Sequence, residues 1–124
     1  MLVNHNFKFN FWQPSTNTMQ IWEEYQKYGI FEMFHNPDCI PLLFSGFTDK
    51  KGKEIFQGDI CKYHKNTSRF LVSYHFEVKF KNGAFYAYWE REMMGKLEQH
   101  WDLLSQKDMR NIRVISNIFQ YKKN

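Results

Sequence analysis

The sequence has little cysteine and no long apolar run, and these two deficits argue against several classes of protein. Cys39 and Cys61 are the only cysteines among 124 residues, so a disulfide scaffold is not expected. No apolar stretch approaches the roughly 20 residues that a helix needs to cross a bilayer. The first residues also lack the basic and then apolar pattern of a secretion signal. We therefore expect a protein of the cytoplasm of the producing cell, with no membrane partner.

Charge of one sign is not concentrated either. The formal net charge is +4, from 17 Lys and Arg against 13 Asp and Glu, and the cations are spread along the chain. A nucleic-acid-binding arm usually gathers its positive charge in one place, so this balance only mildly favours an acidic partner. No repeat, linker or low-complexity tract interrupts the sequence, and its length suits one core. We expect a single domain over residues 1–124.

Aromatic residues are abundant: 13 Phe, 7 Tyr and 4 Trp make up 19% of the chain. Such side chains favour pleated, half-buried strands. The clearest strand covers residues 69–81, where apolar and polar residues alternate, and Asn82-Gly83 then provides a type I′ turn into residues 84–89. This hairpin is expected to pair inner-face residues across the two strands: Phe80 with Phe85, Val78 with Ala87, and Phe76 with Trp89.

Further strands are expected on both sides of this hairpin. Asp49 and Asp59 fall in predicted turns, where an Asp side chain typically accepts a hydrogen bond from nearby backbone. Two readings remain open for Met19 to Tyr28, which fits either a helix or a strand. The remaining predicted strands cover residues 42–47, 54–56, 60–63 and 111–120, with another near residues 7–12.

One α-helix is predicted from about Gly95 to Asp108. Leu97, Trp101 and Leu104 recur there at the spacing of one helical face, and polar residues occupy the other positions. A helix of this kind would cover one face of the sheet. The expected fold is therefore mainly β: a small, strongly bent sheet or partly closed SH3-like barrel of six or seven strands with one α-helix.

No constellation of residues predicts an enzyme. Neither Cys39 nor Cys61 lies in a motif typical of nucleophilic catalysis, and no phosphate-binding loop occurs. His35 with Cys39, and Cys61 with His64, form two half-sites at zinc-ligand spacing, but Pro37 and the predicted strands favour an ordinary structural reading. We expect no catalytic residues, no metal site and no cofactor.

Two groups of residues are candidates for binding a partner. Tyr86 and Tyr88 lie beside His75 and Lys79 on the outer face of the predicted hairpin, an arrangement that suits base stacking or a protein interface. The alternative is that the helix over 95–108 covers this face. The second group is a predicted basic turn, which would contact phosphates or an acidic protein unless it is merely solvated. Its members are Lys50, Lys51 and Lys53.

Three blocks of sequence occur in an order that is typical of a known family. They read FKFNFWQPSTNTM, LLFSGFTDKKGKEIFQGDICKY and IRVISNIFQ, and the central block is the most specific. Over nearly its whole length the chain resembles the YopX-like proteins of bacteriophages and prophages. The resemblance implies a phage or prophage origin and a compact β-rich fold, and it favours two strands joined at residues 14–18. It implies no established activity and no catalytic residues.

The leading functional hypothesis is a non-enzymatic phage accessory protein. It would bind and inhibit or modulate a bacterial host macromolecule, for example a protein of gene control or of an immune system such as CRISPR. One alternative is a nucleic-acid-binding module that uses exposed aromatic residues and basic segments. Another is a self-assembling structural protein, because unpaired strands can form symmetric interfaces. The basic residues of the first alternative are Lys50, Lys51, Lys53, Arg110, Arg113, Lys122 and Lys123.

Overall fold

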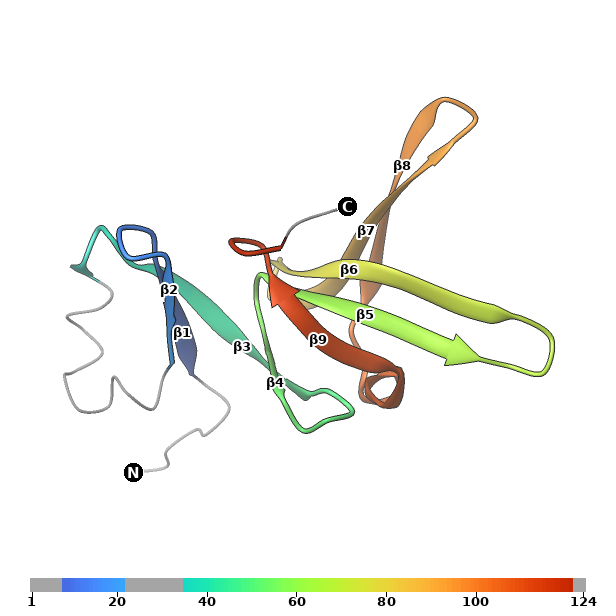
Figure 1. The fold of residues 1–124 in the computed structure, drawn as a ribbon, viewed down its shortest axis with the longest axis horizontal. Coiled ribbons are helices and arrows are strands. Elements are labelled where there is room, and N and C mark those ends of the chain that lie inside the picture. Colours follow the sequence, from blue (N-terminus) through green and yellow to red (C-terminus); the bar gives the residue numbers. More distant parts are fainter. Residues whose placement is uncertain (1–7, 22–34, 122–124) are drawn as a thin grey trace.

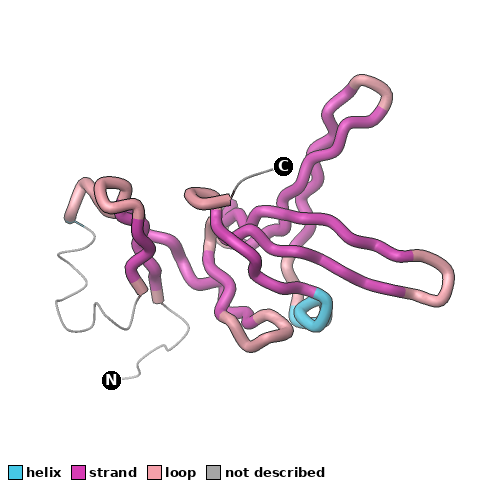
Figure 2. Tube along the Cα trace, in the orientation of Figure 1, coloured by secondary structure: helices cyan, strands magenta, loops and turns pink. Residues whose placement is uncertain are grey.

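The fold is known from a computed structural model that describes residues 8–21 and 35–121 (Figure 1). These residues form nine strands and one short 3₁₀ helix, which confirms the prediction of a mainly β protein. The strands make two sheets, one of four strands in the order β2-β1-β3-β4 and one of five in the order β8-β7-β6-β5-β9. Figure 2 shows that loops and turns join most of these strands.

The four-stranded sheet contains the first predicted strands. Its members are β1 (Phe9–Gln13), β2 (Thr18–Gln20), β3 (Ile40–Thr48) and β4 (Glu54–Phe56), and all neighbours are antiparallel. The pairing of β1 with β2 confirms two strands joined at residues 14–18. Met19 lies in β2, whereas residues 22–28 of the ambiguous segment lie outside the described part of the chain.

The five-stranded sheet is strongly twisted, so its β5–β6 and β7–β8 hairpins extend in different directions (Figure 1). It contains β5 (Asp59–Asn66), β6 (Leu71–Lys81), β7 (Ala84–Met93), β8 (Lys96–Leu103) and β9 (Ile112–Asn117). Phe80 pairs with Phe85 and Val78 with Ala87, as predicted. The register follows from Asn82 and Gly83, whose φ angles of 51° and 81° are those of a type I′ turn.

The main core lies against the inner face of the five-stranded sheet. Ile55 of β4 is fully buried in it, so a strand of the smaller sheet helps to close the core. A second contact joins the sheets where the ring of Trp12 in β1 stacks on Phe119, just after β9, with centroids 4.8 Å apart. Besides Ile55, the core cluster contains Cys61, Phe76, Val78, Ala87, Leu104, Met109, Ile112 and Val114.

The predicted α-helix from Gly95 to Asp108 is wrong. Lys96–Leu103 forms β8, which pairs with β7 along its whole length. Within the predicted range, helical turns begin only at Gln106, in the 3₁₀ helix η1 (Gln106–Asn111). Met94 and Gly95 have φ angles of 53° and 79° and make a second type I′-like turn. Because β7 offers an open edge directly after this turn, hydrogen bonding to β7 outweighs the helical spacing of the apolar residues. Within the described ranges, no helix has the length and apolar character to cross a membrane.

Candidate functional site

The outer face of the β6–β7 hairpin carries four of the predicted binding residues, and three of them lie close together. Lys79 pairs with Tyr86, and Tyr88 pairs with Glu77 on the same face. The intervening residues Val78 and Ala87 point the other way and are buried in the core. The alternation of a strand therefore places the aromatic rings and the lysine together, as the sequence predicts.

Strand β8 extends this face and does not cover it as a helix would. Trp101 pairs with Tyr88 in the β7–β8 ladder, and its ring centroid lies 4.7 Å from that of Tyr88 and 5.9 Å from that of Tyr86. The Trp101 side chain remains 38% exposed. Sequence reasoning had assigned Trp101 to the buried side of a helix, so its place in this site was missed.

Two lysines lie over these rings. The Lys79 Nζ atom is 4.0 Å from the ring centroid of Tyr88 and 5.5 Å from that of Trp101, and the Lys81 Nζ atom is 4.7 Å from that of Trp101. Cation–π attraction at these distances restrains the ammonium groups above the aromatic surface. We call Lys79, Lys81, Tyr86, Tyr88 and Trp101 the aromatic-cationic face.

The opposite end of the same sheet face is acidic and contains His75. The His75 Nδ1 atom lies 2.7 Å from the Tyr121 hydroxyl, and both residues line a hollow of about 270 Å³ with Glu77 and Glu90. The Tyr88 hydroxyl donates a hydrogen bond to Glu90, which is the main cause that raises the pKa of Tyr88 to about 12. Burial raises the pKa of Glu77. His75 thus lies on the same outer sheet face as Tyr88, but the contact that its side chain makes is with Tyr121.

The lysine turn lies apart from the aromatic-cationic face. Lys50, Lys51 and Lys53 are exposed in and after the turn between β3 and β4, on the side of the molecule opposite the β7–β8 turn (Figure 1). The Lys50 backbone N–H donates to the Ile112 carbonyl over 3.0 Å, so this turn adjoins the end of η1 and the start of β9. The two groups of predicted binding residues thus belong to different surfaces.

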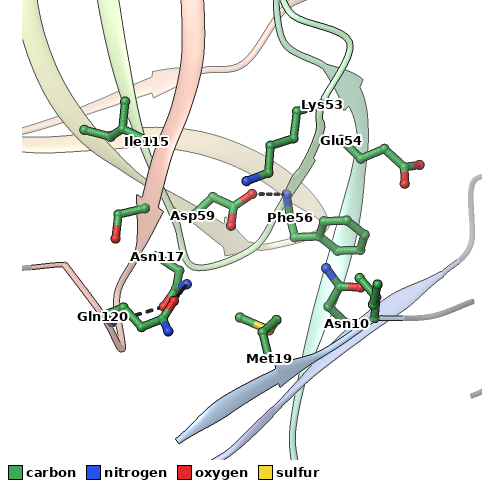
Figure 3. A pocket seen from close by; sticks show the side chains of 11 residues that line it. Asn10, Met19, Lys53, Glu54, Phe56, Asp59, Ile115, Asn117 and Gln120 are labelled. Carbon is green, nitrogen blue, oxygen red and sulfur yellow. Dashed lines mark hydrogen bonds between the residues drawn. The ribbon is translucent and has the colours of Figure 1, made fainter. Parts of the chain in front are cut away.

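A polar cleft of about 450 Å³ lies where the two sheets meet, and the sequence did not predict it (Figure 3). Asp59 lines it, and its Oδ2 atom accepts a hydrogen bond from the Phe56 backbone N–H over 2.8 Å, which confirms its role in the turn. Burial raises the pKa of Asp59 to about 7, although this hydrogen bond and the positive charge of Lys53 act in the opposite direction. A carboxyl group with this pKa is partly protonated at neutral pH, when it can also donate a hydrogen bond.

The two cysteines do not form a reactive pair. Both are free and buried, Cys61 in the main core and Cys39 against Phe11 in a separate cluster. Burial is the main cause that raises the pKa of each thiol, which disfavours the nucleophilic thiolate. Within residues 8–21 and 35–121, no group of three or more His, Cys, Asp or Glu side chains is placed to hold a metal ion.

Comparison with known proteins identifies the family. A family model described as YopX protein matches residues 4–122. No curated protein matches the chain. The match covers all nine described strands, including those of the aromatic-cationic face and of the cleft. The similarity expected from the three sequence blocks is therefore confirmed, and the chain belongs to the YopX family.

Proposed function

We propose that the protein is a non-enzymatic phage or prophage accessory protein that binds a bacterial host protein in the cytoplasm and modulates it. Membership in the YopX family supports a phage- or prophage-type protein. The single observation that carries the binding role is the aromatic-cationic face, where Trp101, Tyr86 and Tyr88 meet two lysines on an outer sheet surface.

The composition of this face is typical of a binding hot spot in a protein interface. Trp and Tyr are enriched among the residues that dominate binding free energy, because each buries a large, rigid surface with little loss of conformational freedom. Contacts between rings and with Lys79 already hold Tyr88 and Trp101 in place before any partner arrives. The lysine ammonium groups favour a partner that presents carboxylates around an apolar patch.

Recovery of partners from a bacterial host lysate tests this proposal. Wild-type protein is expected to retain a stoichiometric host protein, and Trp101→Ala or Tyr88→Ala is expected to weaken that complex about 30-fold, the effect of losing about 2 kcal/mol. The matched control is Lys50→Ala with Lys51→Ala on the distant turn, which should leave the complex intact. Recovery of no stoichiometric protein, or equal loss in the control, contradicts the proposal.

A second candidate function is nucleic-acid binding, and one observation favours it. The hydrogen bond between Lys50 and Ile112 places the lysine turn beside the segment that carries Arg110 and Arg113. These cations come from separate parts of the sequence and gather on one side of the fold, as a phosphate-binding surface requires. This function predicts binding to DNA or RNA that falls steeply with salt. Absence of a gel shift at low salt would exclude nucleic-acid binding as the function.

A further inference from the structure

Strand β8 forms a free edge of the five-stranded sheet. It stands first in the strand order, and within the described ranges it pairs only with β7. Figure 1 shows the β7–β8 hairpin projecting from the body of the molecule. The exposed apolar residues of this hairpin include Leu97 and Leu103, each 61% exposed, and Met94, 99% exposed. A long exposed edge with apolar side chains is a template for another strand.

The backbone of β8 is oriented for such pairing. The two-residue turn at Met94-Gly95 makes Met93 and Lys96 the first hydrogen-bonded pair of the β7–β8 ladder. Hydrogen-bonded and non-bonded pairs alternate along an antiparallel ladder. Even-numbered residues of β8 therefore bond to β7, and odd-numbered residues such as Gln99 direct their backbone N–H and C=O groups to the open edge.

Charge makes the edge self-complementary in one register. If two copies of β8 pair antiparallel about an axis at Gln99, Lys96 stands opposite Asp102 and Glu98 stands opposite His100. Lys96 and Asp102 carry opposite charges, and oppositely charged residues that face each other across strands stabilise the pair. On the other face of the sheet, Leu97 of one copy stands opposite Trp101 of the second, which gives an apolar contact.

The neighbouring registers lack this complementarity. An axis at Glu98 places two Glu98 side chains opposite each other, and an axis at His100 places Glu98 opposite Asp102. Like charges directly opposite each other destabilise strand pairing. Registers displaced by an odd number of residues would bring the inner face of one copy next to the outer face of the other. Among these three registers, the charges along β8 therefore favour the axis at Gln99, which also pairs residues 96–102 of both copies.

We propose that β8 is a dimerisation strand, which pairs with β8 of a second copy of this chain, antiparallel and centred on Gln99. The two five-stranded sheets then form one continuous sheet, and the same surface serves both partners, as two-fold symmetry requires. Two aromatic-cationic faces meet across the axis, where Trp101 of each copy lies beside Leu97 of the other. The inference does not depend on a host partner.

Disulfide trapping tests the register. Directly opposite residues in a hydrogen-bonded pair have Cα atoms about 5.5 Å apart, within the range of about 4.4–6.8 Å that a disulfide spans. Gln99→Cys is expected to cross-link with itself under mild oxidation. Leu97→Cys is the matched control, because the two copies of residue 97 stand four positions apart, about 13 Å along the strand. Cross-linking of Gln99→Cys no faster than Leu97→Cys overturns the proposal.

Light scattering tests the dimer without a cross-link. Wild-type protein is expected to have the mass of two chains, and Lys96→Glu, which places Glu opposite Asp102, is expected to weaken the dimer at least about 10-fold. Adding Asp102→Asn removes the new repulsion and leaves an acceptor for the Trp89 indole N–H, which bonds Asp102 over 2.9 Å in the native chain. Partial recovery of the dimer is therefore expected in the double variant. A monomeric wild type, or an unchanged dimer in Lys96→Glu, overturns the proposal.

Discussion

Asp49 shows how one buried carboxylate can join two distant segments of the chain. It is 6% exposed, its Oδ1 atom accepts hydrogen bonds from the Lys51 and Lys53 backbone, and its Oδ2 atom accepts one from Val114 N–H, 65 residues away. Asp49→Ala is expected to lower the free energy of unfolding by about 3 kcal/mol, since the buried Val114 N–H loses its partner. Urea denaturation measures the loss. Asp49→Asn keeps an acceptor oxygen and should lose less; equal losses in the two variants would show that the hydrogen bonds contribute little.

The raised pKa of Asp59 predicts that the free energy of unfolding depends on pH. Its pKa is raised by burial to about 7 in the folded chain, from an ordinary value near 3.8. The folded state therefore holds a proton that the unfolded state releases, and this contribution to stability is complete below pH 4 and lost as the pH rises through 7. The loss is up to about 4 kcal/mol at about 1.4 kcal/mol for each pKa unit. Urea denaturation between pH 4 and 8 should show a steeper decline for the wild type than for Asp59→Asn; parallel pH profiles would contradict the assignment.

The turn between β7 and β8 places a non-glycine residue in a left-handed conformation. Met94 has a φ angle of 53°, and Gly95 follows it. Met94→Asn creates the Asn-Gly pair that such turns prefer and is expected to raise the free energy of unfolding by about 0.5–1 kcal/mol. Thermal denaturation measures the gain. Met93→Asn, one position earlier in β7, is the control and should give no gain because Asn is disfavoured in strands. A gain in both variants would mean that the turn is not the cause.

Comparison of β8 with the other strands shows which parts of the fold could be predicted from the sequence. Strand β4 and the β6–β7 register were predicted correctly, because Asn82-Gly83 and strict alternation are local signals. Strand β8 was missed, since Leu97, Trp101 and Leu104 fit a helical face and Met-Gly is an uncommon turn pair. A second signal was present: Leu97, Trp101 and Leu103 are all odd-numbered and therefore also share a strand face. The open edge of β7, which decides between the two patterns, is a tertiary property.

Residues of the candidate site were predictable only where one hairpin supplies them. Tyr86, Tyr88 and Lys79 follow from alternation along β6 and β7. Trp101 joins them through the β7–β8 register, which the wrong helix concealed. The contact of His75 with Tyr121 spans 46 residues and has no local signature in the sequence. The cleft around Asp59 could not be predicted from the sequence either, because its walls come from both sheets.

At the scale of the whole molecule, the two sheets are joined by the turn after β9. The Asn117 side chain accepts hydrogen bonds from the Phe119 and Gln120 backbone, and Ile118 N–H donates to the Gly58 carbonyl over 2.8 Å. These bonds place the ring of Phe119 against Trp12 of β1. Trp12 is 3% exposed, and its ring stacks on that of Phe119 with an interplanar angle of 5°. The stack therefore couples the four-stranded sheet to the five-stranded one.

A double-mutant cycle measures this coupling. Trp12→Ala is expected to lower the free energy of unfolding by about 3–5 kcal/mol, as removal of a buried aromatic side chain does. In the double variant Trp12→Ala, Phe119→Ala, the loss should fall short of the sum of the single losses by about 0.5–1.5 kcal/mol, the strength of a stacked aromatic pair. Circular dichroism in urea should also report one transition for the wild type, since Ile55 and this stack bind both sheets into one cooperative unit. Additive losses, or two separate transitions, would show that the sheets fold independently.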